Sequence, residues 1–307
     1  MDWSTFRDLP TAEVARLVRQ HGPKVCVFPI NGTRRWFMLE YGSVRSDEYA
    51  NTYINKLLEK ILDICELFFS YGIDSLLMPV FGSELAERGS EYQVMAAMGL
   101  CRLATFPSLS EFCRNYKVRV HFYGSYRDFF ANNADVNLSA LKQLELETHC
   151  YDQHKLLFGI CANDATETIA SLSVNYYIEY GQVPDKRTLI ELYYGEYIEP
   201  VDIFIGFDQF SAFDMPLIAI GREDLYFTVS PSPYIDDYIL RTILYDHLFS
   251  RRQTPDYENV SLSEWIVIDQ FYKLNRHCVL GTGVIGPGGL WYPRAQVRYP
   301  DNFSFDK

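Results

Sequence analysis

The chain has 307 residues, of which 48% are hydrophobic, and its 40 Asp and Glu against 28 Lys and Arg give a net charge of −12. This apolar content excludes a disordered polypeptide, because disordered chains are depleted in hydrophobic residues. The acidic balance argues against a nucleic-acid partner, which needs a basic face, but a local cluster of donors still suffices for a small phosphorylated ligand. The 16% of aromatic residues is enough for a large core and for the lining of a sizeable cavity.

Charges are spread through the first thirty residues, and the chain contains no run of about 18 uncharged apolar residues. We therefore expect a cytoplasmic protein with no transmembrane segment. The seven cysteines form an odd set without a C-x-x-C pair. This pattern favours reduced thiols over a disulfide framework or a zinc site.

Apolar runs of strand length alternate with helical patterns over the first 250 residues. In chain order, the pattern predicts a strand at 24–28, a helix at about 46–71, a strand at 75–80, a helix at 83–103, a short helix opened by a capping box at Ser108 and Glu111, a strand at 118–123, a helix at 138–148, a strand at 155–160, a helix at 163–180, strands at 202–206 and 224–229, and a helix at 236–250. Such alternation is typical of right-handed βαβ units. We expect one α/β domain over 1–307, with a central, mostly parallel six-stranded sheet flanked by helices and an irregular tail from about 251.

The exit of the first predicted strand carries a candidate anion site. In open parallel sheets, ligands lie beyond the carboxyl ends of the strands. Here that position is occupied by Asn31, Gly32, Thr33, Arg34 and Arg35. A glycine lets backbone amides approach an anion, and adjacent guanidinium groups bind phosphate oxygens in bidentate fashion, so a diphosphate is the ligand that this loop favours. By pattern alone, a surface turn with two solvated arginines explains the loop equally well.

The stretch from residue 22 to 37 resembles the bacterial diterpene synthases that form tuberculosinol, isotuberculosinol and kolavelool. These enzymes share the cis-prenyltransferase fold of undecaprenyl diphosphate synthase. The resemblance extends in order over nearly the whole chain, through Glu87-Arg88-Gly89 with Tyr92, His121-Phe-Tyr-Gly124, Tyr193-Tyr-Gly-Glu-Tyr197, Asp202-Ile-Phe-Ile-Gly-Phe207, Leu225-Tyr-Phe-Thr-Val229 and Leu244-Tyr-Asp-His247.

The resemblance implies specific roles for individual residues. It implies that the leaving diphosphate and the carbocation are handled by the catalytic residues Tyr49, Tyr92, Arg34 and Arg35. It implies substrate binding by Asn31, Gly32, Thr33, Trp36, Ser211 and Trp291, and Mg²⁺ as cofactor, with Asn31 and Asp224 as metal ligands. It also implies a homodimer.

Two departures from cis-prenyl chain elongation bear on the reaction. Gly206 and Gln209 occupy positions where the elongating enzymes carry arginines for a second diphosphate substrate, so elongation is disfavoured. Asn31 replaces the Asp of the first loop, and an amide oxygen can ligate Mg²⁺ but contributes no negative charge.

We therefore expect a diterpene synthase that ionises a bicyclic C20 allylic diphosphate, of kolavenyl or tuberculosinyl type, supplied by a class II diterpene cyclase. Water would then add to give an alcohol such as kolavelool or tuberculosinol, with release of diphosphate. Aromatic faces suit the carbocation, because they stabilise positive charge without supplying a lone pair. One alternative is prenyl transfer to another acceptor, such as adenosine. Another is a non-catalytic subunit that binds a prenyl diphosphate, which Asn31 favours.

Overall fold

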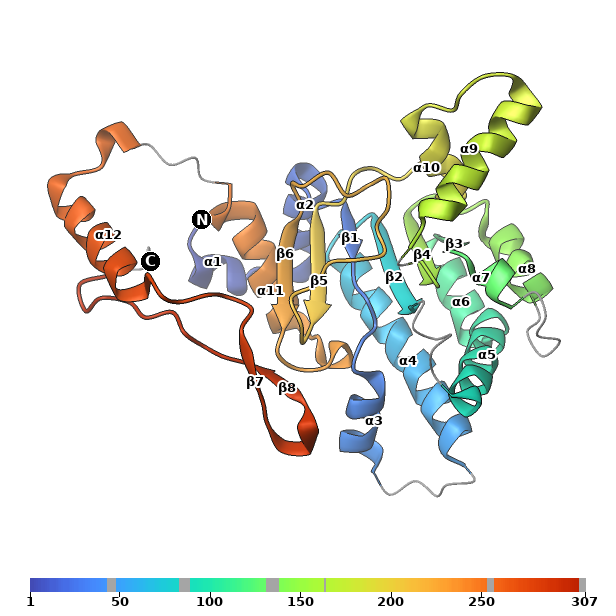
Figure 1. Cartoon of the computed structure of the whole chain (residues 1–307), viewed down its shortest axis with the longest axis horizontal. Coiled ribbons are helices and arrows are strands. Elements are labelled where there is room, and N and C mark those ends of the chain that lie inside the picture. Colours follow the sequence, from blue (N-terminus) through green and yellow to red (C-terminus); the bar gives the residue numbers. More distant parts are fainter. Residues whose placement is uncertain (43–47, 83–88, 131–137, 163, 253–256, 304–307) are drawn as a thin grey trace.

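The protein is described here by a computed structural model that covers residues 1–42, 48–82, 89–130, 138–162, 164–252 and 257–303, without the side chains of 90–92, 128, 129 and 257. Its centre is a six-stranded sheet in the order β3-β4-β2-β1-β5-β6, in which every neighbouring pair is parallel (Figure 1). The strands are β1 (Val25–Val27), β2 (Ser75–Phe81), β3 (Val118–Tyr123), β4 (His154–Ile160), β5 (Ile203–Phe207) and β6 (Asp224–Thr228). The predicted fold class is thereby confirmed.

Helices flank this sheet and precede its first strand. They are α1 (Trp3–Arg7), α2 (Thr11–His21), α3 (Thr33–Tyr41), α4 (Tyr49–Ser70), α5 (Ser90–Ala104), α6 (Pro107–Tyr116), α7 (Tyr126–Phe129), α8 (Leu138–Thr148), α9 (Thr166–Tyr180), α10 (Lys186–Tyr194), α11 (Asp237–Tyr245) and α12 (Leu262–Asn275). A π-helical turn at Asp246–Ser250 extends α11. Among the described residues, no helix is long and apolar enough to cross a membrane.

Alternating strand residues divide the core into two clusters, one on each face of the sheet. Cys26 packs into the larger cluster, with residues from α2, α4, α6, α8 and α11, whereas its neighbours Val25 and Val27 pack into a smaller one with α10. Successive strand side chains point to opposite faces, so a strand buried on both faces reads as a continuous apolar run. This explains why the short strands were recognisable from sequence.

The structure differs from the sequence predictions outside the sheet: α1, α2, α3, α7 and α10 were not predicted, and two predicted features are wrong. Helix α6 begins at Pro107, and its N-cap is Phe106, whose side chain makes no capping bond. The predicted capping box at Ser108 and Glu111 is therefore wrong. A capping box is instead formed by Ser261 and Glu264, at the start of α12. The tail is also not irregular, because it contains α12 and the antiparallel hairpin of β7 (Gly283–Ile285) and β8 (Trp291–Pro293).

Candidate active site

A cavity of about 1070 Å³ lies at the carboxyl ends of β1, β2 and β5. Its walls come from the loop after β1 and the start of α3, from α4, from the end of β2, from the loop after β5 and from one residue of the tail. The lining residues are Ile30, Asn31, Gly32, Thr33, Arg34, Arg35, Met38, Tyr49, Tyr53, Leu57, Pro79, Val80, Phe81, Gly82, Phe207, Asp208, Gln209, Ser211, Phe213, Asp214 and Leu290. The position agrees with the rule for ligands of open parallel sheets.

Gly32 forms a tight junction between β1 and α3. It is the N-cap of α3 and has a φ of +72°, in the left-handed region that favours glycine. A Cβ added there would lie 2.6 Å from the ring of Phe207 and 2.9 Å from Pro231. Only glycine therefore lets α3 start against the end of β5. The first N–H groups of α3 have no acceptor within the helix, and their dipoles favour an anion at this end.

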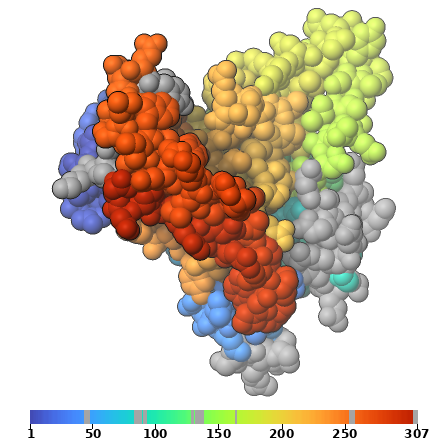
Figure 2. Space-filling model, turned by 60° about the vertical axis from the view of Figure 1, so that its left-hand side comes forward, coloured from blue at the N-terminus to red at the C-terminus, as the bar shows by residue number. Residues whose placement is uncertain are grey.

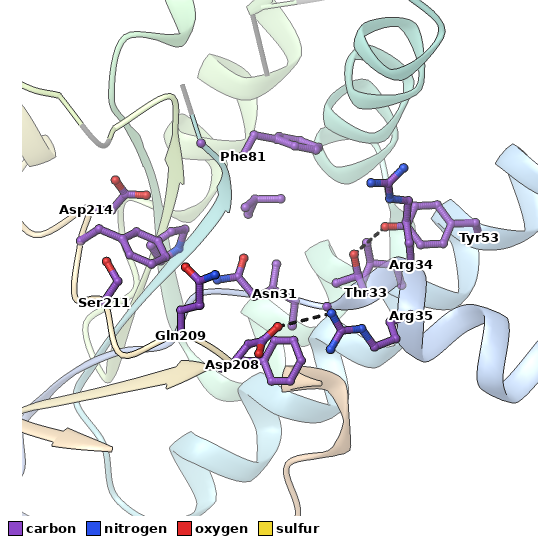
Figure 3. A pocket seen from close by; sticks show the side chains of 18 of the residues that line it. Asn31, Thr33, Arg34, Arg35, Tyr53, Phe81, Asp208, Gln209, Ser211 and Asp214 are labelled. Carbon is purple, nitrogen blue, oxygen red and sulfur yellow. Dashed lines mark hydrogen bonds and ion pairs between the residues drawn. The ribbon is translucent and has the colours of Figure 1, made fainter. Parts of the chain in front are cut away.

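Two arginines and a tyrosine hydroxyl stand beside this helix start (Figure 3). The Arg35 guanidinium forms an ion pair with Asp208 at 3.3 Å and lies 5.1 Å from the centroid of the Phe207 ring. The Thr33 hydroxyl lies 2.6 Å from the Tyr53 hydroxyl. Together with Arg34, these groups provide positive charge and hydroxyl donors for the oxygens of a diphosphate.

A second wall, which meets the arginines at the Arg35–Asp208 ion pair, is acidic and amidic rather than basic. It is formed by the loop after β5, which contributes Asp208, Gln209, Ser211 and Asp214 (Figure 3). Asp208 and Asp214 have φ values of +69° and +60°, and the Asp214 residue is only 4% exposed. The buried Tyr123 hydroxyl donates to the Asp214 carbonyl at 3.1 Å. Burial, and then the Asp214 charge, raise the pKa of Tyr123, so this phenol stays protonated.

A smaller apolar cavity of about 40 Å³ adjoins the main one between α4 and α5. Four residues line both spaces, so the polar end of the cavity continues into an apolar lobe: Tyr53, Leu57, Val80 and Phe81. The remaining lining residues of the lobe are Ile54, Leu58, Ile61, Met95, Ala96, Gly99, Leu100 and Leu103. The main cavity is large enough for an amphiphile with an anionic head and a hydrocarbon body, and the lobe extends its apolar end by a small volume.

Most of the residues predicted from the first loop meet in this cavity. Asn31, Gly32, Thr33, Arg34 and Arg35 line it, as do Tyr49 and Ser211 from other parts of the chain. The Tyr49 ring is stacked on that of Tyr53, with centroids 6.0 Å apart and an interplanar angle of 8°. Since Tyr53 lies one helical turn after Tyr49, the i to i+4 spacing could have identified it.

Trp36, expected at the substrate, is instead a core residue. It is 5% exposed and packs against Tyr41, with ring centroids 5.8 Å apart. Helix α3 begins at Thr33, and three residues later the helix turns Trp36 away from the cavity. Trp291 is not among the described lining residues either, although its neighbour Leu290 is. The Tyr92 side chain lies outside the described part of the structure.

The structure does not bring Asp224 to the cavity. It is the first residue of β6 and is in register with Ile203, whereas the cavity lies at the other end of β5, at Phe207. Four strand residues span about 13 Å. Asp224 accepts a hydrogen bond from Nδ1 of the buried His247 at 2.7 Å and pairs with Arg251 at 3.4 Å. This position corrects the expectation that Asp224 and Asn31 hold one metal ion.

Sequence reasoning missed Leu290 and the two aspartates in the loop after β5, Asp208 and Asp214. Asp208 directly follows a buried strand, and a polar residue just after the carboxyl end of a parallel strand is a candidate ligand-binding residue. The sequence therefore contained a signal for Asp208. Asp214 and Leu290 carried no comparable signal, because their approach to the cavity depends on how the loop after β5 and the tail fold back.

The fold belongs to the cis-prenyltransferase class. Over 80% of this chain and 100% of the other, it matches the crystal structure of lavandulyl diphosphate synthase from Lavandula x intermedia in complex with dimethylallyl diphosphate, with a TM-score of 0.59 and 12% identity. It also matches a probable undecaprenyl diphosphate synthase from Campylobacter jejuni over 76% of this chain and 98% of the other, with a TM-score of 0.55 and 15% identity. At these identities the likeness shows the fold alone.

Sequence comparison identifies the family more closely. The chain is 38% identical to tuberculosinyl adenosine transferase from Mycobacterium tuberculosis, over 94% of its length and 96% of the relative. It is 25% identical to (+)-kolavelool synthase from Herpetosiphon aurantiacus, over 91% and 92%. No protein-family model matches it. The chain therefore belongs to the family of tuberculosinyl adenosine transferase and is an enzyme on a fold that processes prenyl diphosphates, which confirms the resemblance stated from sequence.

Proposed function

We propose that the protein ionises a bicyclic C20 allylic diphosphate and transfers the diterpenyl group to adenosine. The observation that carries this proposal is the division of one cavity into a cationic helix start, an apolar lobe and an acidic wall. The first two parts match the two ends of a prenyl diphosphate. The third part faces them, where a second substrate would approach.

The diphosphate would bind at the start of α3. Arg34 and Arg35 supply charge and paired N–H donors, and the backbone amides of the first turn of α3 point towards the same anion. The allylic C–O bond breaks heterolytically, and both electrons leave with the diphosphate. These groups favour that step because the negative charge on the leaving oxygens increases as the bond breaks.

The carbocation and its hydrocarbon would lie beside Tyr49 and Tyr53, with the decalin rings reaching towards Leu57 and Phe81 at the entry of the apolar lobe. The aromatic faces stabilise the cation and are poor nucleophiles. An apolar surrounding also keeps bulk water from the cation until the acceptor reacts.

The acidic wall suits an uncharged acceptor. Asp208 and Asp214 can accept hydrogen bonds from an amino group or ribose hydroxyls, and Gln209 can both donate and accept. A lone pair on an adenine nitrogen then forms the new C–N bond, and the positive charge passes from the carbocation to the adenine, which becomes neutral again if it releases an N–H proton to solvent. The transferase relative, at 38% identity, supports adenosine as this acceptor and moves it ahead of the water that sequence reasoning placed first.

Water is the second candidate acceptor, and the likeness to kolavelool synthase favours it. The ionisation would be the same, but water would bond through its oxygen and release a proton, giving the diterpene alcohol. The two reactions therefore differ only in which nucleophile reaches the cation first.

Mg²⁺ is part of this proposal. The Asn31 amide and the Asp208 carboxylate would hold it, since Mg²⁺ is usually bound by one or two protein oxygens together with substrate phosphates. The described residues contain no group of three or more His, Cys, Asp or Glu able to hold a metal ion by themselves. When bound, the ion would supply positive charge to the leaving diphosphate.

The test is to incubate the protein with tuberculosinyl or kolavenyl diphosphate and Mg²⁺, with and without adenosine. We expect diphosphate release and a diterpenyl nucleoside detected by mass spectrometry. Arg34→Ala should lower turnover by at least about tenfold. Arg16→Ala is the matched control, because Arg16 is exposed on α2 and pairs with Glu13. Absence of diphosphate release from both substrates would refute the proposal.

Two expectations about partners remain part of the proposal. A homodimer is supported by α9 and α12, which bury no residue and expose large apolar side chains such as Ile178 and Leu262. A class II cyclase would supply the substrate, as the likeness to the diterpene synthases implies. Sedimentation of the purified protein would test the dimer.

A further inference from the structure

Residues 261–303, here called the strap, form a unit with their own internal contacts. The Asn275 side chain donates to the Arg298 carbonyl at 2.7 Å and accepts from the Arg298 N–H at 2.9 Å. The rings of Tyr299 and Phe303 both lie 5.6 Å from that of Phe271. Since α12 buries no residue, these bonds, and not burial in the main core, hold the strap together.

The hairpin end of the strap reaches the cavity. In Figures 1 and 2 its hairpin, in red, extends beside α3. At Gly281 it meets the loop after β5, since an added Cβ there would lie 3.4 Å from the Phe210 ring. Leu290, half-buried, is the strap's contribution to the cavity lining within the described residues. The strap thus spans from the acidic wall to the helix that holds the diphosphate site.

The hairpin holds Leu290 in place mainly through its backbone. The Gly286 N–H donates to the Leu290 carbonyl at 2.9 Å, and Ile285 is in register with Trp291. Gly288 and Gly289 have φ values of +71° and +69°, and a Cβ on Gly289 would meet nothing within 4 Å. The turn is therefore exposed, and the body of the domain touches it little. Leu290 contributes an apolar side chain to a cavity that is lined by both polar and apolar residues.

We propose that Leu290 determines which acceptor is used: its apolar side chain lines the cavity in which the carbocation would form and limits the access of bulk water to it. This inference rests on the proposed function, in which water and adenosine compete for one cation. A hydroxyl or a shorter side chain at position 290 would admit water on that side. The leaving group and the ionising residues would be unchanged.

The experiment compares four proteins in the assay with adenosine present: wild type, Leu290→Ser, Leu290→Met and Ile285→Ser. We expect Leu290→Ser to raise the ratio of diterpene alcohol to diterpenyl nucleoside roughly tenfold, the effect of altering one apolar contact in a pocket. Total diphosphate release should stay within about twofold of wild type, because ionisation is untouched. Leu290→Met keeps volume and polarity and should keep the wild-type ratio.

Ile285→Ser is the matched control, because Ile285 lies on the same hairpin, is 70% exposed and does not line the cavity. It should leave the ratio unchanged, so a hairpin that is merely loosened would be recognised. An unchanged ratio in Leu290→Ser, or a folded Leu290→Ser protein that no longer releases diphosphate, would overturn the inference. A wild type that releases no diphosphate would instead refute the proposed function, and the acceptor role of Leu290 with it.

Discussion

Replacing Gly32 by Ala tests the junction between β1 and α3 on which the proposed diphosphate site depends. The substitution has two costs. A residue with a Cβ at a φ of +72° costs roughly 1–2 kcal/mol. The Cβ also overlaps the Phe207 ring at 2.6 Å and Pro231 at 2.9 Å, and such overpacking costs about 1–3 kcal/mol. We therefore expect the free energy of unfolding to fall by about 2–5 kcal/mol.

Gly181→Ala is the control that separates the two costs. Gly181 has a φ of +70°, and an added Cβ there would meet nothing within 4 Å. The free energy of unfolding of Gly181→Ala should therefore fall only by the backbone cost, roughly 1–2 kcal/mol. Both values come from urea unfolding followed by circular dichroism, with linear extrapolation to water.

The overlap also has a consequence for binding. To relieve it, α3 must move away from Phe207, which displaces the helix amides and both arginines together. We expect the affinity of Gly32→Ala for inorganic diphosphate, measured by calorimetry, to fall at least about tenfold, since 1.4 kcal/mol corresponds to that factor. The reasoning is refuted if Gly32→Ala and Gly181→Ala are equally stable and Gly32→Ala binds diphosphate as wild type does.

Three further predictions follow from other contacts. Asp208→Asn removes the carboxylate that pairs with Arg35, so this variant should bind inorganic diphosphate up to about fivefold more tightly than wild type in EDTA. In Mg²⁺ it should bind diphosphate more weakly than wild type, because the ion loses a ligand. A change of affinity in the same direction in both buffers would contradict a dual role of Asp208. Burial lowers the pKa of His247 in the folded protein, although Asp224 opposes the shift. His247 therefore binds a proton more readily in the unfolded chain, and the free energy of unfolding should decline as the pH falls from about 6.5 towards the folded-state pKa. Denaturant titrations from pH 7.5 to 5 should show a smaller decline in His247→Asn, and an equal decline would assign the effect elsewhere, for instance to His154, whose pKa burial also lowers. The double variant Phe210→Cys, Gly281→Cys should form a disulfide on mild oxidation, because a Cβ added at Gly281 would lie 3.6 Å from that of Phe210. Thiol titration of the double variant against each single variant checks this, and failure to cross-link would mean that the strap does not rest on the loop after β5.

The sheet and the first loop were predictable because their signals are local. A strand such as Leu76 to Met78, buried on both faces, is a continuous apolar run, and Gly32 followed by arginines is typical of an anion site at a helix start. The roles of single residues were not local in this sense. The direction in which the Trp36 side chain points depends on where α3 begins, since the first helical residue determines which face of the helix each later side chain occupies.

Asp224 shows a second limit of sequence reasoning. Whether a polar residue beside a strand reaches the cavity depends on which end of the strand it occupies and on the register with the neighbouring strand. Asp224 begins β6, whereas Asp208 follows β5, and the parallel pairing places them at opposite edges of the sheet. The sequence alone shows two strands with nearby acidic residues. The end of the strand at which the acidic residue lies determines whether it lines the cavity, as Asp208 does, or pairs with His247, as Asp224 does.

The charges around the cavity limit the kind of second substrate. Arg34 and Arg35 stand at the helix start, while Asp208 and Asp214 line the facing loop, and residues 206–221 contain no Lys or Arg. Two like unit charges 8 Å apart repel by about 2 kcal/mol at an effective dielectric constant of 20, and a second diphosphate would carry several such charges against both the aspartates and the first diphosphate. An uncharged nucleophile avoids this repulsion and can donate hydrogen bonds to the same carboxylates. Under the proposed function, a change from elongation to transfer to an uncharged acceptor would require no new catalytic group at the leaving diphosphate, only a wall that repels one class of acceptor and accommodates another.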